Sequence, residues 1–389
     1  MTPAYFDYAA SNPIDPRVRE AVEGSLTLVG NPSSAHSFGR QCLTVMDRAR
    51  GSVAGLLGAE LGEIVFTSGA TEANSMALWG HFRRLRELYG PSVELRLAVS
   101  PLEHASVRTT VARLESELGV TVDRIPVDAD GVTDMAGLSA TITPATAMVC
   151  VMWANNVIGS LQPMSSVGEA VVSERRRRGP SGLPILLMTD AVQAMRTEEV
   201  RPCDAFVDLM AVSGHKFYAP KGIGVLYVRR GVDLSSPVAG GGQESGRRGG
   251  TENLSGIVGL GTAAELLVAE RQADRELIKG LTSRLRSSLR GIGGLTVYGD
   301  PNQTVPGIVF FVVNGVDGGT LALKLDSVGF AVSTGSACDA GRRKVSPTLE
   351  SICSGQALRH GGIRVSIGRF TTESEVEGLV SAIRTILGR

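Results

Sequence analysis

Residues 211–222 read Ala-Val-Ser-Gly-His-Lys-Phe-Tyr-Ala-Pro-Lys-Gly. The apolar run at 207–212 predicts a buried strand, and the Ser-Gly pair after it predicts a sharp turn that places His215 and Lys216 among apolar neighbours. Partial removal of a lysine from water favours its neutral form, which a nucleophilic amine or a Schiff base requires. A surface turn with solvated lysines explains this stretch equally well.

Composition limits the classes of partner. The 389 residues allow two or three domains, and the 39 basic and 39 acidic residues cancel. No charge excess directs the chain to nucleic acid or to an anionic membrane. The first 15 residues lack the pattern of a signal peptide, and no apolar run approaches membrane-spanning length. We therefore expect no direct nucleic-acid partner and no membrane partner.

The five cysteines do not form a recognisable framework. They are widely spaced, with no CxxC pair, at Cys42, Cys150, Cys203, Cys338 and Cys353. An odd number at these spacings argues against structural disulfides and against a zinc site. We expect free thiols, no metal and a cytoplasmic location.

The first two thirds of the chain alternate between two periodicities. Helical periodicity marks residues 16–28, 36–57, 71–88, 105–118 and 164–174. Short apolar or β-branched runs occupy 64–67, 95–100, 121–125, 147–152, 185–188 and 207–212. This alternation predicts an α/β domain with a largely parallel, buried sheet, which binds ligands at the carboxyl ends of its strands.

The pattern changes after a glycine-rich loop at residues 240–251. Predicted helices follow at 253–269 and 274–289, then strands at 295–298 and 308–313, and a closing helix at 373–387. We interpret this part as a smaller α+β domain packed beside the first residues. The predicted large domain is 15–258, and 1–14 with 259–389 form the small one. The arginines at 175–178 predict a solvated helix end.

Polar groups follow several predicted strands. Small residues with Ala70 and Thr71 open a helix whose free N–H groups suit a phosphate, although an ordinarily capped helix is the simpler explanation of that motif alone. The other strand ends carry an imidazole, an amide pair and a carboxylate with a nearby amide, at His104, Asn155, Asn156, Asp190 and Gln193. Each one alone is explained by turn or cap chemistry. Together with Lys216, they converge on one edge of the sheet.

This set of groups matches pyridoxal 5′-phosphate (PLP). PLP needs a lysine, a helix N-terminus for its phosphate, a flat side chain against its ring, and a carboxylate at the pyridine nitrogen. The competing dinucleotide pattern, GxGxxA at residues 259–264, lies in a helical stretch with no strand before it. We therefore do not interpret it as a dinucleotide site.

Two motifs carry a family resemblance: Ser-Gly-His-Lys at 213–216 and Ser-Thr-Gly-Ser-Ala-Cys at 333–338. Further matches lie at 5–10, 30–36, 67–72, 103–104, 155–156, 190–193, 249–251 and 362–366. The sequence resembles the cysteine desulfurases of the PLP-dependent fold-type I, class-V aminotransferase-like superfamily, in the branch of iron–sulfur-cluster sulfur donors. That resemblance implies a large domain with a mainly parallel seven-stranded sheet, beside the smaller α+β domain.

The resemblance also implies residue roles. Lys216 would bind PLP covalently and move the substrate Cα proton, while Lys221 would be exposed and dispensable. His104 would stack on the pyridine ring, Asp190 would pair with its nitrogen, and Gln193 would bond its hydroxyl. The remaining implied cofactor contacts are Ala70, Thr71, Asn155, Ser213, His215 and, from the other subunit of a homodimer, Thr251. Arg364 would bind the substrate carboxylate as a bidentate fork, helped by Asn155.

Cys338 decides the implied reaction type. The loop at 335–341 is rich in small residues, which suits a reactive thiol better than a packing cysteine. By resemblance, the Cys338 thiolate takes the sulfur of L-cysteine, L-alanine leaves, and the persulfide passes to an acceptor protein. Two departures from the family pattern are Val157, where an acidic residue is usual, and Asp339, which disfavours the neighbouring thiolate unless the basic residues 342–344 offset it.

The alternatives are another class-V PLP enzyme, such as an aminotransferase or selenocysteine lyase, and a non-catalytic sulfur-relay scaffold. The sequence does not choose among iron–sulfur assembly, DNA or tRNA thio-modification and biosynthesis as the fate of the sulfur.

Overall fold

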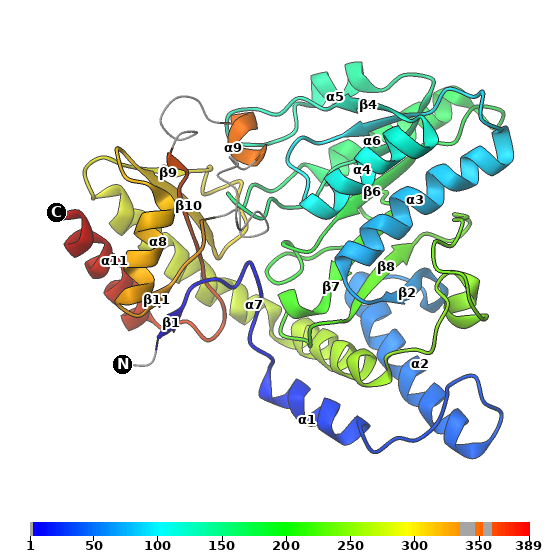
Figure 1. Ribbon diagram of the computed structural model, residues 1–389, viewed down its shortest axis with the longest axis horizontal. Helices are drawn as coiled ribbons and strands as arrows, with labels where there is room; N and C mark the ends of the chain where they lie inside the picture. Colours follow the sequence, from blue (N-terminus) through cyan, green and yellow to red (C-terminus); the bar gives the residue numbers. More distant parts are fainter. Residues whose placement is uncertain (1–2, 335–346, 353–359) are drawn as a thin grey trace.

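The computed structural model describes residues 3–334, 347–352 and 360–389. Its centre is a seven-stranded sheet in the order β2-β8-β7-β6-β5-β3-β4 (Figure 1). The strands are β2 (Ile64–Thr67), β3 (Arg96–Val99), β4 (Thr121–Arg124), β5 (Thr146–Cys150), β6 (Leu186–Asp190), β7 (Leu209–Ser213) and β8 (Gly224–Val228). Six run in one direction, and β8 is antiparallel to both neighbours. The predicted fold class is confirmed, although the periodicity did not single out β8.

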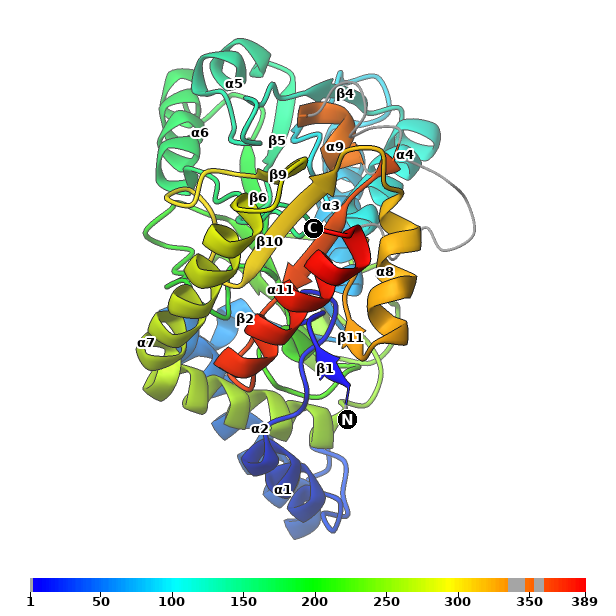
Figure 2. The same cartoon turned by 90° about the vertical axis from the view of Figure 1, so that its left-hand side faces the viewer.

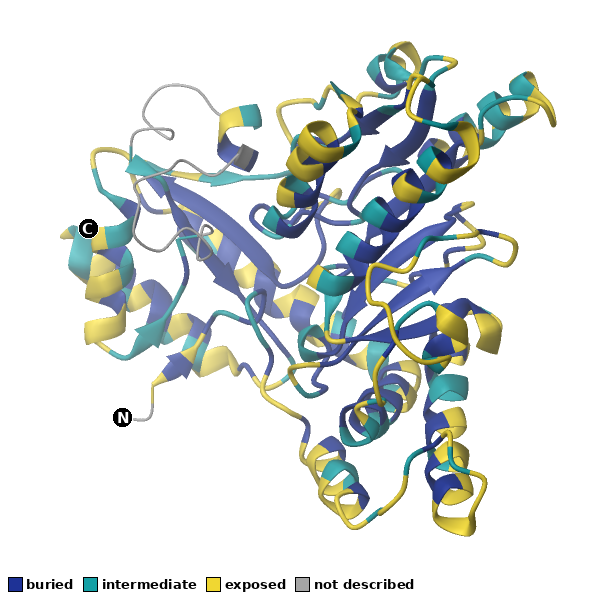
Figure 3. Cartoon of the chain, turned by 45° about the vertical axis from the view of Figure 1, so that its right-hand side comes forward, coloured by how far each residue is buried: buried dark blue, intermediate teal, exposed yellow. Residues whose placement is uncertain are grey.

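The sheet is buried on both faces because successive side chains along each strand point to opposite sides. In β7, Leu209 and Ala211 join one apolar cluster, whereas Met210 and Val212 join the other. The first cluster includes residues of α3 (Ala70–Tyr89) and α4 (Ala105–Leu118). The second includes α1 (Pro16–Ser25), α2 (Ser37–Leu57), α5 (Met135–Thr141), α6 (Met164–Arg178) and the start of α7 (Leu254–Arg290). Figure 3 shows the buried strands between helices with exposed outer faces.

Helix α7 connects the large sheet to the rest of the chain (Figure 1). The prediction of two helices is wrong here: residues 270–273 contain only good helix formers, so one helix of 37 residues continues through them. Its first half packs in the large core and its second half in a separate cluster. The proposed domain boundary at 258/259 lies inside this helix, and the division stays a proposal.

The second sheet has the order β12-β10-β9 and is antiparallel. Its strands are β9 (Leu295–Tyr298), β10 (Ile308–Val313) and β12 (Ile363–Ser366), and it shares an apolar cluster with α7, α8 (Gly318–Ser327) and α11 (Glu373–Leu387). Strand β1 (Ala4–Tyr5) pairs in parallel with β11 (Phe330–Ala331), so the start of the chain lies beside this sheet (Figure 2). A short helix, α9 (Pro347–Ile352), completes the described elements of this part.

The glycines of the GxGxxA pattern serve helix packing. A Cβ atom at Gly259 would lie 2.7 Å from Val22 Cγ2, and one at Gly261 would lie 2.7 Å from Ala49 Cα. Only glycine permits this close approach of α7 to α1 and α2. The structure therefore gives these glycines a packing role within a helix.

The predicted solvated helix end at 175–178 is partly wrong. The side chain of Arg178 is only 5% exposed, and it donates hydrogen bonds to the carbonyls of Thr143, Thr146 and Leu183. Arg175 donates to the buried carboxylate of Asp208 at 2.7 Å. These arginines satisfy backbone carbonyls beside the sheet, which a charge run alone does not reveal. Among the described helices, none is long and apolar enough to cross a bilayer.

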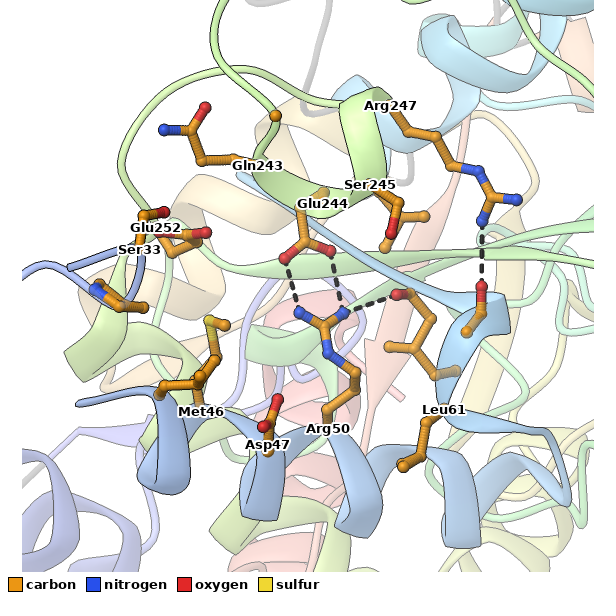
Figure 4. A pocket seen from close by; sticks show the side chains of 16 residues that line it. Ser33, Met46, Asp47, Arg50, Leu61, Gln243, Glu244, Ser245, Arg247 and Glu252 are labelled. Carbon is orange, nitrogen blue, oxygen red and sulfur yellow. Dashed lines mark hydrogen bonds and ion pairs between the residues drawn. The ribbon is translucent and has the colours of Figure 1, made fainter. Parts of the chain in front are cut away.

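The glycine-rich loop is anchored to α2 by a buried ion pair (Figure 4). Glu244 and Ser245 have left-handed φ values of 48° and 57°, and the Glu244 carboxylate accepts from Arg50 at 2.7 and 2.9 Å. It also accepts from the Phe66 N–H at 2.8 Å. The two side chains are only 14% and 2% exposed, beside a cavity of about 530 Å³ between the loop and α2. This anchor holds the backbone that leads to Thr251.

We predict that Glu244→Ala lowers the free energy of unfolding by about 3 kcal/mol, because it leaves the guanidinium of Arg50 buried without its partner. Chemical denaturation of the purified protein measures this loss. The matched control is Glu117→Ala, which removes an exposed ion pair with Arg113 and should have a much smaller effect. Equal losses in the two variants would contradict the role of the buried pair.

Candidate active site

A cavity of about 530 Å³ lies at the carboxyl ends of the large sheet's parallel strands. Nine of the residues predicted for the site line it: Ala70, Thr71, His104, Asp190, Gln193, Ser213, His215, Lys216 and Arg364. They come from four strand ends of the large sheet and from β12. Parallel strands bring such residues together because their carboxyl ends share one edge.

Lys216 lies in a 3₁₀ turn, η2 (Gly214–Lys216), directly after β7. Its Nζ donates to the carbonyl oxygens of Ala9 at 2.5 Å and Ala10 at 2.7 Å. The Asn12 side chain donates to the Lys216 carbonyl. The segment from β1 therefore encloses the lysine, a contact that the sequence did not reveal. Lys221 is exposed at the rim of the same cavity.

His215 is a neutral neighbour of that lysine. Burial, followed by the charges of Lys216 and Lys221, lowers the pKa of His215 to about 4. Its Nδ1 lies 3.2 Å from the hydroxyl of Ser11. At neutral pH the ring thus offers hydrogen bonding without adding a positive charge.

The N-terminus of α3 faces the cavity through Gly69, Ala70 and Thr71. Its N-cap, Gly69, provides no side-chain hydrogen bond to the first turn. A Cβ atom at Gly224, where β8 begins, would lie 2.6 Å from the Gly69 Cα, so glycine is required for this approach. An uncapped helix N-terminus with a positive dipole end suits an anion such as a phosphate.

His104 is the N-cap of α4, and its Nδ1 accepts a hydrogen bond from the Ser106 N–H at 3.2 Å. Burial lowers the pKa of His104, and the charges of Lys216 and Arg108 lower it further, against the opposing effect of Asp190. The ring is therefore neutral, with its proton on Nε2 because Nδ1 is an acceptor. A neutral planar ring at this position is suited to stacking on a flat cofactor.

Asp190 is the buried last residue of β6. Its Oδ1 accepts from the Val192 N–H at 3.0 Å and its Oδ2 from the Asn74 amide at 2.8 Å. Asp190 lines the cavity and, as a carboxylate, keeps lone pairs for a further donor such as a pyridinium N–H.

Glu103, the residue before His104, is a second buried carboxyl group at this wall. Its Oε1 accepts from the Met152 N–H at 2.6 Å, and its Oε2 has no hydrogen-bond partner among the described residues. Burial and then the charge of Asp190 raise the pKa of Glu103 to about 8. At neutral pH this group is mainly protonated, so it adds little negative charge beside Asp190.

Arg364, on β12, brings the guanidinium of the site. It donates to Asp7 Oδ1 at 2.6 Å and to the Asn156 carbonyl at 2.9 Å, while its buried Nε has no partner among the described residues. An arginine has five N–H donors, so capacity remains for a carboxylate. The contact with Asp7 was not predicted from the sequence.

Two of the described site residues are not brought to the cavity lining. Asn155 is fully buried, and its Nδ2 donates to the Leu102 carbonyl and the Thr348 hydroxyl. Its Oδ1 accepts from the N–H groups of Val157 and Ile158. The neighbouring Asn156 lines the cavity. Val157, the departure from the family pattern, donates its backbone N–H to Asn155 Oδ1 at 2.8 Å, and its side chain packs in a small apolar cluster. Thr251 is exposed in the glycine-rich loop. Cys338 lies outside the described residues.

The groups in the cavity fit PLP: a lysine, an anion-binding helix end, a neutral imidazole and a carboxylate with neutral donors. Arg364 would add a contact for a carboxylate substrate. Across residues 3–334, 347–352 and 360–389, no cluster of three or more His, Cys, Asp or Glu side chains could hold a metal ion.

We predict that Glu103→Gln changes how stability depends on pH. The pKa of Glu103 in the fold, about 8, exceeds the ordinary 4.5, so the folded state holds a proton that the unfolded chain releases. The free energy of unfolding therefore falls as pH rises from about 4.5 to about 8, by at most about 1.4 kcal/mol per pH unit. The neutral glutamine removes that loss, so the melting temperature of the variant should rise relative to that of the wild type as pH increases from about 4.5 to about 8.

The control for this prediction is Glu115→Gln, which changes an exposed carboxylate on α4 and should follow the wild-type pH profile. A constant difference between Glu103→Gln and the wild type across the pH range would be inconsistent with a protonated Glu103.

Comparison with known proteins shows which family this chain belongs to. The class-V aminotransferase family matches residues 4–379. A cysteine desulfurase of Mus musculus is 39% identical over 97% of this chain and 80% of its own, and the cysteine desulfurase IscS of Cronobacter sakazakii is 37% identical over 100% and 93%. The solved structure of a NifS-like protein aligns over 100% of both chains, with 30% identity and a TM-score of 0.90.

A further solved structure, titled SspA in complex with cysteine, is 30% identical, covers 95% of this chain and 99% of its own, and has a TM-score of 0.79. The match in sequence extends over nearly the whole chain, and the fold agrees with it. The chain therefore belongs to the class-V aminotransferase family, within its cysteine desulfurases.

Proposed function

We propose that the protein is a PLP-dependent L-cysteine desulfurase whose active site is the cavity around Lys216. The observation that carries this proposal is the meeting of Lys216, His104, Asp190 and Arg364 in one cavity. The family supports it, because class-V cysteine desulfurases depend on PLP. The relative described as a complex with cysteine supports the choice of substrate.

Each residue has a role that follows from its surroundings. Bound PLP would supply an electron sink for carbanion charge on the substrate Cα. Lys216, on the turn after β7, moves the Cα proton with its Nζ. The neutral ring of His104 would stack on the pyridine ring of PLP, and the Asp190 carboxylate would accept from the pyridine nitrogen. Gln193, whose Nε2 donates to the Ala9 carbonyl, would bond the hydroxyl of the pyridine ring.

The substrate and the phosphate are bound by separate groups of the cavity lining. Arg364 binds the carboxylate of L-cysteine through its guanidinium, with Asn155 shaping the adjoining turn. Ala70, Thr71, Ser213 and His215 hold the phosphate at the N-terminus of α3, where the helix dipole favours an anion.

Cys338 receives the sulfur. The Cβ–S bond of L-cysteine breaks and an S–S bond forms at Cys338, so L-cysteine and the thiol give L-alanine and a persulfide. No outside oxidant is needed, because the substrate Cβ is reduced to the methyl group of L-alanine, gaining a proton as its bond to sulfur breaks, while the transferred sulfur is oxidised to the sulfane level of the persulfide. The acceptor is a protein thiol of an iron–sulfur, nucleic-acid thio-modification or biosynthetic system. Balanced charge and free cysteines support a cytoplasmic location.

A homodimer would complete the site. Thr251 is exposed at the end of the loop anchored by Arg50 and Glu244, which suits a contact with the phosphate bound in another subunit. The proposed large domain, 15–258, would then contribute to both sites of the dimer, and the small domain would carry Cys338.

We predict that Cys338→Ser releases less than about 1% of the wild-type sulfide from L-cysteine in the presence of a thiol reductant, because it lacks the sulfur-accepting nucleophile. The variant should keep the visible absorption of bound PLP, which Lys216→Ala should lose. Cys203→Ser is the matched control, since Cys203 is an exposed free cysteine, and it should keep full release. Normal release by Cys338→Ser would rule out the persulfide route and favour another class-V reaction.

We also predict that the PLP-bound protein sediments as a dimer, and that Thr251→Ala weakens PLP binding while the dimer persists, because a hydrogen bond to the phosphate is lost. Sedimentation velocity with absorption at a PLP band measures both quantities in one run. A monomer that retains PLP would refute the shared site.

A further inference from the structure

A chain of hydrogen bonds links the two cofactor contacts His104 and Asp190 through residues without an assigned role. Asn74, on α3, donates one amide N–H to Asp190 Oδ2 at 2.8 Å and the other to Ser106 Oγ at 2.9 Å. Ser106 Oγ lies 2.9 Å from His104 Nδ1. Three elements, β6, α3 and α4, therefore meet in one connected network.

Every bond in this network has one possible direction. Asp190, when ionised, can only accept, so the Asn74 nitrogen must face it. The Ser106 N–H donates to His104 Nδ1, so that nitrogen is an acceptor and the Ser106 hydroxyl must donate to it as well. The hydroxyl oxygen then accepts from Asn74. With Asp190 as the acceptor from Asn74, these directions give a His104 ring with its proton on Nε2.

Asn74 has an energetic cost that simple packing does not explain. It is fully buried, and its Oδ1 has no hydrogen-bond partner among the described residues. A buried acceptor without a partner destabilises the fold, whereas an apolar residue of similar size would avoid this penalty. The benefit of asparagine at this position must come from its two N–H donors.

We propose that Asn74 is a positioning residue that holds the Asp190 carboxylate directly and, through Ser106, fixes the orientation and tautomer of the His104 ring toward PLP. This proposal rests on the proposed function, because it concerns how the same cavity receives PLP. The other ionisable groups that act on this pair are Glu103, Lys216 and Arg108.

A purely structural role would also join α3 to α4, and the chain offers a control for it. The hydroxyls of Ser75 and Thr110 lie 3.0 Å apart and connect the same two helices. Neither residue lines the cavity or bonds to Asp190 or His104. Loss of this contact should disturb the helix pair without changing the cofactor contacts.

The experiment compares the wild type with Asn74→Ala, Ser106→Ala and Ser75→Ala. PLP is removed from each full-length protein and titrated back, to measure its dissociation constant and then the pH midpoint of its visible absorption. Asn74→Ala should weaken PLP binding about tenfold, the loss expected for a hydrogen bond to a charged group. It should also shift the pH midpoint, because the Asp190 carboxylate that would face the pyridine nitrogen loses one of its hydrogen-bond donors.

Ser106→Ala should shift both quantities in the same direction by less, and Ser75→Ala should match the wild type. An Asn74→Ala protein that behaves like Ser75→Ala would overturn the proposal. If circular dichroism shows that Asn74→Ala does not fold, wild-type values for Ser106→Ala would overturn it instead. A wild-type protein that binds no PLP would be a failure of the proposed function, visible before any variant is compared.

Discussion

The common direction of six strands is the constraint on which the site depends. Because these strands end at one edge, Lys216, Asp190, His104 and the start of α3 meet although they are up to about 150 residues apart in sequence. The antiparallel strand β8 does not disturb this edge, since its glycine start allows the α3 N-terminus to approach closely. The alternating burial of both sheet faces fixes the register that keeps these ends aligned.

In the cavity, the Asp190 carboxylate is surrounded by neutral hydrogen-bonding and ionisable groups. Asp190 is stabilised by an amide and a backbone N–H, and the neighbouring Glu103 is mainly protonated. Both histidines are neutral because burial and nearby cations lower their pKa values. Among the basic groups that line the cavity, Lys216 and Arg364 are those that the proposed chemistry uses, and Arg108 and Lys221 are the others. A cofactor with a phosphate and a protonated ring would meet a preorganised set of partners.

Much of this site could be predicted from sequence because its residues directly follow strands. Lys216, His104 and Asp190 each stand within a few residues of an apolar run, so the parallel-sheet rule was enough to bring them together. Asn74 and Ser106 could not be found in this way, because they lie inside helices and their partners depend on how α3 and α4 pack. The contacts of Asp7 with Arg364 and of the Ala9 and Ala10 carbonyls with Lys216 could not be found either, because they depend on the path of the first residues between the two sheets.

The errors have physical causes as well. Helix α7 continues through residues 270–273 because nothing there interrupts a helix, and Arg178 is buried because open carbonyls beside the sheet need donors. The role of Asn155 stays a prediction: its Oδ1 accepts from the N–H groups of Val157 and Ile158, and the motif alone does not distinguish such a turn from ligand binding.

The central claim is that this cavity holds PLP through Lys216 and not through Lys221, the other lysine at its rim. Borohydride reduction of the PLP-bound protein, followed by proteolysis and mass spectrometry, locates the modified lysine. The account predicts a phosphopyridoxyl group on Lys216 alone. Modification of Lys221, or of no lysine, would contradict it.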